Sequence, residues 1–113
     1  MNIRFDQKNQ VLQIILSGEL DHHSSVSARE QIDLRITTAC CQKIVYLLDE
    51  LSFMDSSGIG LIANGCKVAH AIGAKVFVYT QNEKFLKMFQ LARLQELCPI
   101  LSLEKELNTL WKS

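Results

Sequence analysis

Apolar and polar positions divide the chain into short strands and longer helical stretches. The predicted strands are residues 3–6, 11–16, 43–48, 74–79 and 98–101. The first two carry alternating or β-branched apolar residues, so we expect them to pair antiparallel around a turn, with Gly18 ending the second. The run at residues 43–48 is almost entirely apolar, which is typical of a central strand covered by helices. Pro99 restricts the last strand to an edge of the sheet.

Helical spacing predicts four helices between and after these strands. The expected boundaries are residues 24–39 with Ser24 or Ser25 as the cap, residues 57–72 stopped by Gly73, a helix opened by Asn82, and a last helix capped by Ser102. Apolar stripes on the first, third and fourth helices indicate which faces are buried. These stripes are Ala28, Ile32, Ile36 and Ala39; Phe85, Leu86, Phe89 and Ala92; and Leu103, Leu107, Leu110 and Trp111.

The order of these elements predicts an α/β fold. Helices that connect successive strands require those strands to run parallel. We therefore expect a single domain over residues 1–113, with a mixed, mostly parallel sheet of four to five strands and about four helices. In such a sheet, functional groups gather where strands end and helices begin. The turn at residues 55–58 occupies that position.

The composition excludes several classes of partner. The formal net charge is zero and the 12 basic and 12 acidic residues are mixed along the chain, so we expect no nucleic-acid partner. The apolar stretches are too short for a membrane span and Met1 begins no signal peptide, so we expect a cytoplasmic protein without a membrane partner. The four cysteines lack metal-binding spacing, which favours buried thiols in a reducing compartment, with no metal and no cofactor.

Two serines between a strand and a helix carry the candidate chemistry. We expect Ser57 to cap the helix by accepting hydrogen bonds from N–H groups of the first turn, which leaves Ser56 free to point outward. Asp55 adds negative charge beside a helix N-terminus, which is stabilising. Gly58 and Gly60 leave the turn unshielded, so that a partner's backbone or a phosphate can approach it closely.

A phosphate on Ser56 would act as a switch. It brings about −1.5 to −2 charges at pH 7, and a helix N-terminus tolerates this charge, so the domain stays folded. A partner docked across the turn would meet the dianion beside Asp55 and lose binding free energy. These residues favour regulation by charge without unfolding.

The helix at residues 57–72 is apolar around most of its circumference. One stripe, expected to pack on the sheet, is Ile59, Ile62, Ala63, Cys66 and Ala69. A second set lies off that stripe and consists of Leu61, Gly65, Val68 and Ile72. Either a neighbouring helix buries this second set or a partner protein covers it.

Two motifs carry a resemblance to a known family. They are Gly-Glu-Leu-Asp-His-His at residues 18–23 and Leu-Ser-Phe-Met-Asp-Ser-Ser-Gly-Ile-Gly at residues 51–60. Over essentially its whole length the chain resembles a STAS domain of the anti-sigma factor antagonist family, close to the sporulation branch that acts on sigma factor F. One position departs from the family, which often has glycine where Arg93 stands. A left-handed backbone there would cost arginine on the order of 1–2 kcal/mol, whereas otherwise the helix simply runs on.

The resemblance implies a partner-switching role. Members of this family bind an anti-sigma factor that is also a serine kinase, and thereby free the sigma factor. The kinase phosphorylates the first serine of Asp-Ser-Ser-Gly, here Ser56, the phosphorylated form lets go, and a phosphatase restores it. By the same analogy Asp21 and its neighbours lie beside the turn. With the turn and the helix face, the expected partner-binding residues are Asp21, His22, Asp55, Ser57, Gly58, Ile59, Leu61 and Val68.

Alternative interpretations belong to other classes of function. A hydrolytic triad would recruit Ser56, a histidine and an acid, but the Gly-x-Ser-x-Gly motif is missing, so we expect no enzyme. The adjacent His22 and His23 rarely aim at one metal ion. Within the same family, the rival role is an accessory subunit of an ABC-type lipid transporter or a stressosome-like scaffold. There the same helix face binds an ATPase or further copies of the domain, and the motif serine is mainly a cap.

Overall fold

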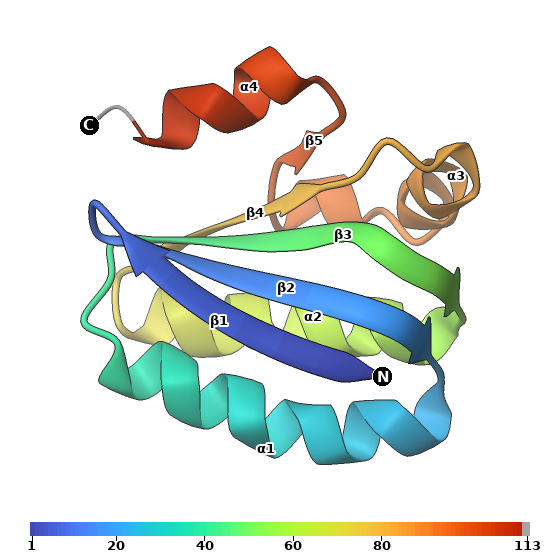
Figure 1. Ribbon diagram of the computed structural model, residues 1–113, viewed down its shortest axis with the longest axis horizontal. Coiled ribbons are helices and arrows are strands. Elements are labelled where there is room, and N and C mark those ends of the chain that lie inside the picture. Colours follow the sequence, from blue (N-terminus) through green and yellow to red (C-terminus); the bar gives the residue numbers. More distant parts are fainter. Residues whose placement is uncertain (112–113) are drawn as a thin grey trace.

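Five strands form one sheet in the order β1-β2-β3-β4-β5 in the computed structural model of the protein, which describes residues 1–111 (Figure 1). The strands are β1 (Asn2–Lys8), β2 (Val11–Leu20), β3 (Lys43–Met54), β4 (Lys75–Tyr79) and β5 (Ile100–Leu101). β1 pairs antiparallel with β2, and every later pair is parallel. The predicted mixed, mostly parallel sheet is confirmed. The single domain over residues 1–113 stays a prediction, and its last two residues lie outside the described part.

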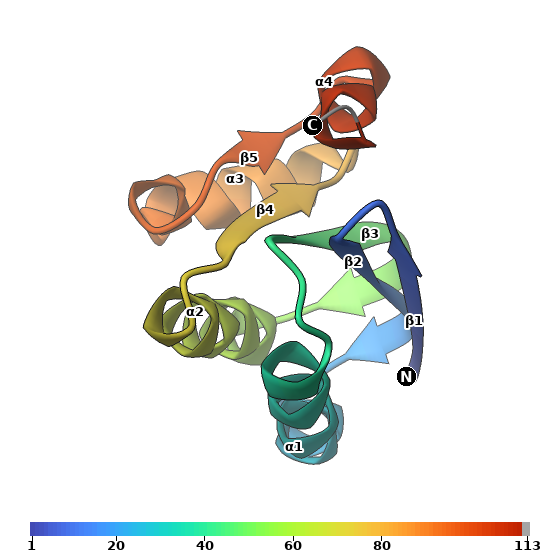
Figure 2. The ribbon, with the colours of Figure 1, turned by 90° about the vertical axis from the view of Figure 1, so that its left-hand side faces the viewer.

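The helices lie on both sides of this sheet. They are α1 (His22–Thr38), α2 (Ser56–Ala71), α3 (Glu83–Leu91) and α4 (Glu104–Asn108), with short 3-10 segments η1 (Leu94–Glu96) and η2 (Thr109–Trp111). α1 and α2 run side by side under one face, whereas α4 lies over the other face (Figures 1 and 2). No helix within residues 1–111 is long and apolar enough to cross a membrane.

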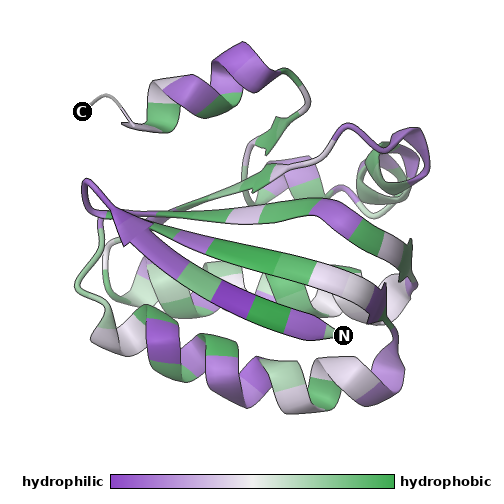
Figure 3. Cartoon of the chain, viewed as in Figure 1, coloured by the Kyte–Doolittle hydropathy of each residue, from purple (hydrophilic) through white to green (hydrophobic). Residues whose placement is uncertain are grey.

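The larger core lies between the sheet and the pair α1 and α2. Its strand residues include Ile14, Tyr46 and Val78, all fully buried, and α1 contributes Ile32 and Ile36. In Figure 3 the central strands are mostly coloured as hydrophobic, whereas the helices carry both hydrophobic and hydrophilic colours, as expected of helices with one buried side. A smaller cluster on the opposite face consists of Val11, Val45, Tyr79 and Leu110. Burial of these apolar side chains is the main stabilising contribution to the fold.

β2 and β3 both extend further than the sequence predicts. Gly18 does not end β2, because its positive φ of 88° accommodates an irregularity in the register and pairing resumes through Leu20. β3 continues to Met54, which pairs with Leu20. The Ser52 hydroxyl donates to the Gly18 carbonyl at 3.1 Å across this extension. The two strands therefore end together, directly before α1 and α2.

Of the caps predicted for α1, α3 and α4, two are wrong and one is confirmed. α1 begins at His22 with Asp21 as its N-cap, rather than at Ser24 or Ser25. Ser102 does not cap α4, because Leu103 occupies that position. Asn82 caps α3, and its Oδ1 accepts from the N–H groups of Lys84 and Phe85 at 2.9 and 3.2 Å. In the α3 stripe Phe85 and Phe89 are buried and Leu86 is half-buried, whereas Ala92 lies just past the helix end and is exposed.

Arg93 adopts the left-handed backbone conformation, with φ 58° and ψ 34°. Of the two alternatives for this position, the helix therefore stops and does not run on. A residue with a Cβ in this conformation costs on the order of 1–2 kcal/mol relative to glycine. The departure from the family's usual glycine thus stores strain between α3 and η1.

The cysteines differ in exposure. Cys41, Cys66 and Cys98 are buried as expected, but Cys40 is exposed, and all four are free thiols. Burial raises the pKa of the Cys41 thiol. Within the described residues no group of three or more His, Cys, Asp and Glu side chains lies together in a way that could hold a metal ion.

Candidate functional site

The carboxyl ends of β2 and β3 place two aspartates next to each other. Leu20 pairs with Met54 at the last register position, and the Asp55 N–H donates to the Leu20 carbonyl at 3.2 Å. Asp21 and Asp55 follow directly and cap α1 and α2. Parallel strands that end level with each other bring both helix N-termini to one edge of the sheet. The predicted proximity of Asp21 to the turn is thus a consequence of this register.

At the start of α1, Asp21 and Ser24 form a reciprocal capping box. The Ser24 N–H donates to Asp21 Oδ1 at 2.9 Å, and the Asp21 N–H donates to Ser24 Oγ at 3.0 Å. The Ser24 hydroxyl also lies 3.2 Å from the Glu19 carbonyl. Hydrogen bonds from the backbone and side chain of Ser24 to the charged carboxylate lower the pKa of Asp21 below its ordinary value of 3.8. The Asp21 carboxylate and both the N–H group and the hydroxyl of Ser24 are thus hydrogen-bonded at this helix start.

At the start of α2, the cap is Asp55 and not Ser57. Asp55 Oδ1 accepts from the Ser57 N–H at 2.8 Å, and the Asp55 backbone is extended as an N-cap requires. Ser56 is the first helical residue and Ser57 the second. The prediction that Ser57 caps the helix is wrong because β3 continues to Met54, which shifts the helix start by one residue.

Ser56 is exposed, and its hydroxyl makes no hydrogen bond within residues 1–111. Ser57 is half-buried and faces α1, where its side chain lines a groove. Because the backbone N–H groups at a helix start lack intrahelical partners, the surroundings of Ser56 favour negative charge. The expectation that Ser56 points outward is therefore confirmed, although the helix is capped by Asp55 and not by Ser57.

The two glycines of the turn have different roles. A Cβ on Gly58 would lie within 2.9 Å of Leu20 Cδ2 and closer still to the Met54 side chain, so only glycine fits there without rearrangement. A Cβ on Gly60 would meet nothing within 4 Å. Gly58 is buried and serves packing inside the domain, and the expectation that it leaves the turn open to a partner holds only for Gly60.

α1 packs beside α2 and covers part of the second helix face. Leu61 is only 5% exposed and Gly65 is buried, so neither presents a side chain for a partner to cover. A polar network joins the two helices, in which Arg29 donates to Asn64 Oδ1 at 2.8 Å and Asn64 Nδ2 donates to the Asp33 carboxylate at 3.1 and 3.2 Å. The neighbouring helix therefore lies beside Leu61, whereas Gly65 is buried against the Tyr46 hydroxyl of β3 and Ile72 is 48% exposed.

The remaining predicted contact residues are half-buried, and one of them lies far from Ser56. Ile59 and Val68 are half-buried, and both pack against the larger core. Val68 stands twelve residues beyond Ser56, about 18 Å along the helix. The structure thus gathers Asp21, His22, Asp55 and Ser57 at one edge, and places Val68 outside that group.

A groove of about 240 Å³ separates the starts of α1 and α2. It is lined by His22, Ser25, Val26, Arg29, Ser57, Gly60 and Leu61. Leu61 is nearly buried here, whereas Val26 is 61% exposed. Ser25, Val26 and Arg29 were not among the predicted contact residues. An apolar Val26 off the buried stripe of α1 was the sequence signal that could have identified this face.

A second groove, of about 620 Å³, lies on the other side of the turn. The end of β3 and the start of α3 form it, and its lining includes Phe53, Asn82, Lys84 and Met88. Phe53, two residues before the cap, is 47% exposed although it lies in a strand. Grooves with exposed apolar side chains therefore flank the Ser56 turn on both sides.

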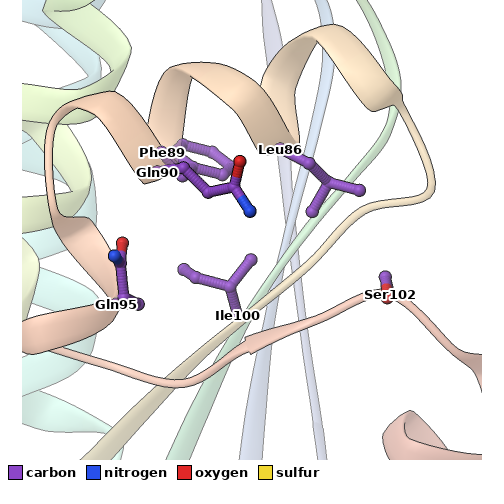
Figure 4. A pocket seen from close by; sticks show the side chains of 6 residues that line it. All are labelled: Leu86, Phe89, Gln90, Gln95, Ile100 and Ser102. Atoms are coloured by element: carbon purple, nitrogen blue, oxygen red, sulfur yellow. The ribbon is translucent and has the colours of Figure 1, made fainter.

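A further pocket of about 330 Å³ lies between α3 and β5 (Figure 4). It is lined by Leu86, Phe89, Gln90, Gln95, Ile100 and Ser102. It shares no residue with the Ser56 turn or with either flanking groove. We therefore do not assign it to this site.

Within the described residues the histidines form no triad with Ser56. His70 lies fourteen residues beyond Ser56 on the same helix, about 21 Å away. His22 shares a groove with Ser57, but no hydrogen bond links Ser56 to a histidine within residues 1–111. Within residues 1–111 the exposed Ser56 hydroxyl therefore has no hydrogen-bonded base of the kind that activates a nucleophile.

Comparison with known proteins gives a consistent result. The STAS domain family model matches residues 2–107. The anti-sigma F factor antagonist of Paenibacillus polymyxa is 36% identical over 112 residues, covering 97% of this chain and 94% of that relative. Two structures, the anti-sigma factor antagonist SpoIIAA in its unphosphorylated form and the Bacillus cell fate determinant SpoIIAA in the phosphorylated form, each match with a TM-score of 0.72 at 25% identity. Each of the two matches covers 96% of this chain. The match covers 94% of the unphosphorylated chain and 99% of the phosphorylated one.

These matches extend over nearly the whole described chain and include both sequence motifs at the helix starts. The fold of the described residues agrees with the two SpoIIAA structures at a TM-score of 0.72. The chain belongs to the STAS domain family.

Proposed function

We propose that this protein is an anti-sigma factor antagonist of the sporulation type, controlled by phosphorylation of Ser56. In its unphosphorylated form it binds an anti-sigma factor that is also a serine kinase, and so frees a sigma factor in the cytoplasm. The kinase transfers a phosphoryl group to Ser56, the complex separates, and a phosphatase regenerates the binding form. The chain itself acts as substrate and binding partner and has no catalytic role.

The observation that carries this proposal is the free hydroxyl of Ser56 at the first position of α2. It is exposed and makes no hydrogen bond within residues 1–111, whereas the N–H of Ser57 is already held by Asp55. A kinase must bring its nucleotide within bonding distance of the accepting oxygen, so an exposed hydroxyl without competing bonds meets the first requirement. The similarity to anti-sigma F factor antagonists, one in Paenibacillus polymyxa, supports the same role.

The position of Ser56 explains how a phosphate could leave the fold intact. A dianion at a helix N-terminus is stabilised by the unsatisfied N–H groups and by the helix dipole. The side chain points to solvent, so the phosphate displaces no packed group. That SpoIIAA has a solved structure in each form, both matching this chain equally well, supports a fold that bears the modification.

The same phosphate would weaken the complex with the kinase. Asp55 and Asp21 already place two carboxylates at this edge, and a partner covering it must desolvate the added charge. An uncompensated charge enclosed in an interface costs about 3–5 kcal/mol, which exceeds a hundredfold change in affinity. The groove between α1 and α2, with His22 on its rim, gives the kinase a continuous docking surface beside the turn.

The experiment combines the purified protein with a candidate anti-sigma factor serine kinase and with ATP, followed by intact-mass measurement and peptide mapping. We expect one phosphate on Ser56. Ser56→Ala should accept none and remain bound to the kinase. Ser57→Ala is the matched control, since it removes the neighbouring hydroxyl but keeps Asp55 as the cap, and it should still be phosphorylated at Ser56.

Phosphate on Ser57 or on another residue would contradict the proposal. Binding to a transporter ATPase or to further copies of the domain, without phosphorylation, would favour the accessory or scaffold role instead. An equal affinity of the kinase for the phosphorylated and unphosphorylated forms would remove the switch.

A further inference from the structure

β5 forms one edge of the sheet and pairs with β4 on one side only. The Val78 N–H donates to the Pro99 carbonyl at 3.0 Å. The Thr80 N–H donates to the Leu101 carbonyl at 3.1 Å. In a parallel ladder the intervening residue faces the other way, so Ile100 directs its own N–H and C=O away from β4. Neither group takes part in a hydrogen bond within residues 1–111, and such an edge is open to a further strand.

The usual protections of a sheet edge are weak here. Proline protects an edge by lacking an N–H, but the Pro99 carbonyl faces β4, and the N–H and C=O of one strand residue point to the same side. The missing donor therefore lies on the β4 side and leaves the outer side of Ile100 unblocked. Between Leu97 and Leu103 the chain carries no charged residue that would repel a second strand. Only the short length of β5 limits pairing.

The pocket of about 330 Å³ between α3 and β5 lies beside this edge (Figure 4). Ile100 points from β5 toward α3, where Leu86 and Phe89 supply the rest of the apolar lining. The other three lining residues are neutral and polar, so no charged side chain lines the pocket. A strand added next to β5 would therefore find space for an uncharged, apolar side chain.

Exposed leucines stand at equal distances on either side of Ile100. Leu97, three residues before it, is 43% exposed, and Leu103, three residues after it, is 50% exposed. When two identical strands pair antiparallel about Ile100, residues equally far from the centre approach each other. Leu97 of one copy then meets Leu103 of the other at both ends, through side chains that lie beyond the paired backbone. This self-complementary spacing favours a second copy of the chain over an unrelated strand.

We infer that β5 is the contact surface of a symmetric homodimer in which the β5 strands of two copies pair antiparallel. The Ile100 N–H of each copy donates to the Ile100 carbonyl of the other, so a single residue satisfies both free groups. Directly opposite residues lie on the same face of a sheet, so the two Ile100 side chains meet beside the pockets. The two sheets become one continuous sheet.

The contact is small and separate from the Ser56 turn. Two backbone hydrogen bonds and a few apolar side chains place it at the low end of specific interfaces, so association is weak and depends on concentration. The pocket beside β5 shares no residue with the two grooves that flank the turn. Pairing through β5 thus leaves both turns uncovered, and the inference does not depend on the proposed function.

The first test exchanges the facing leucines for opposite charges. Sedimentation equilibrium of the full chain between about 10 µM and 1 mM should show a monomer–dimer equilibrium. Leu97→Lys and Leu103→Glu should each weaken it about tenfold or more, because each charge faces a leucine of the other copy. The double variant places Lys opposite Glu at both ends and should recover the original affinity to within roughly threefold.

Leu34→Glu is the matched control, because Leu34 is 66% exposed on α1, which lies away from β5 (Figures 1 and 2). It should associate as the unmodified protein does. Leu97 and Leu103 are exposed, so these variants should also keep the melting temperature of the unmodified protein. A chain that stays monomeric up to about 1 mM would overturn the dimer and leave this edge to a strand of another protein. Equal weakening by Leu34→Glu, or a double variant weaker than both single variants, would also overturn it.

The second test is a cross-link at the two-fold axis, in a Cys40→Ser background that removes the exposed thiol. Cα atoms of a hydrogen-bonded antiparallel pair lie about 5.5 Å apart, within the span of a disulfide. Mild oxidation of Ile100→Cys should therefore give a covalent dimer that dithiothreitol reverses, whereas Leu34→Cys should stay monomeric. Equal cross-linking of both variants, or none for Ile100→Cys, would contradict pairing about Ile100.

Discussion

The starts of α1 and α2 follow adjacent parallel strands, and each has an aspartate as its N-cap. They differ in whether their serine hydroxyls take part in hydrogen bonds. At α1 the third helical residue is Ser24, whose hydroxyl completes a capping box with Asp21. At α2 the third residue is Gly58, and no capping box forms. The serine hydroxyls there lie one and two positions earlier, and Ser56 makes no hydrogen bond within residues 1–111.

Packing explains the difference. The space beside the third position of α2 is filled by Met54 and Leu20, so a residue with a Cβ does not fit and a second capping box is ruled out. At the start of α1 the Ser24 hydroxyl is held in the capping box and contributes to stability. At the start of α2 no capping box forms, so a backbone N–H donor and the Ser56 hydroxyl are left without these hydrogen bonds. This lowers the stability of the helix start but leaves a hydroxyl that can be modified.

The largest expected effect is on binding. Ser56→Asp places a permanent charge at the free helix start, and we expect the kinase to bind it at least about 100-fold more weakly, equal to about 2.7 kcal/mol. Its melting temperature should stay close to that of the unmodified protein, since the charge lies at a helix N-terminus. Isothermal titration calorimetry and thermal unfolding measure the two properties separately.

Ser27→Asp is the control for added charge, because Ser27 is exposed on α1 and does not line the groove beside the turn. It should bind the kinase as the unmodified protein does. Equal weakening by both variants would show that the kinase responds to net charge and not to the Ser56 position.

Gly58 and Gly60 of α2 should respond in opposite directions to alanine. Gly58→Ala forces a Cβ against Met54 and Leu20, so we expect a net loss of about 1–2 kcal/mol in the free energy of unfolding. Gly60→Ala meets open space within a helix and should gain about 0.5–1 kcal/mol. Urea denaturation of both variants provides the measurement. A stabilised Gly58→Ala protein would refute the packing explanation for the missing capping box.

Removing each aspartate cap tests whether the capping box strengthens α1. Asp55→Ala should cost about 1 kcal/mol of unfolding free energy, as a single N-cap does. Asp21→Ala should cost more, because Asp21 and Ser24 satisfy each other's N–H groups. The two losses are compared at pH 7 by urea denaturation.

The unfolding free energy lost in Asp21→Ala should also depend on pH. The folded state lowers the pKa of Asp21, so its contribution is complete above the unfolded pKa and disappears as the pH falls through the folded value. The difference between Asp21→Ala and the unmodified protein should therefore be full at pH 7 and shrink below about pH 4. A difference independent of pH would show that the carboxylate charge is not what stabilises α1.

The two serine hydroxyls should differ in their contribution to stability, and the smallest expected effect is that of Ser56. Ser24→Ala removes the acceptor for the Asp21 N–H and should cost about 1 kcal/mol. Ser56→Ala removes no hydrogen bond and should change the unfolding free energy by less than about 0.5 kcal/mol. A large loss for Ser56→Ala would indicate a structural role for this hydroxyl and weaken its assignment as a free acceptor.

Much of this arrangement was predictable from local patterns. Apolar runs identified all five strands, and crossover helices indicated a mostly parallel sheet. Asn82 was recognised as a cap because a single candidate preceded the helix, and the outward direction of Ser56 followed from its place at the strand-to-helix turn. The caps of α1 and α2 were missed because aspartate and serine are equally good caps.

The sequence by itself determined the element order, the motif at the turn and the presence of an available serine there, because these depend on residues within a few positions of one another. Tertiary structure decided which residue caps α2, since pairing of Leu20 with Met54 extends β3 and moves the helix start to Ser56. It also decided that Leu61 is buried, because α1 packs beside α2. Contacts between distant segments carry no periodic signal in the chain, so only the folded arrangement reveals them.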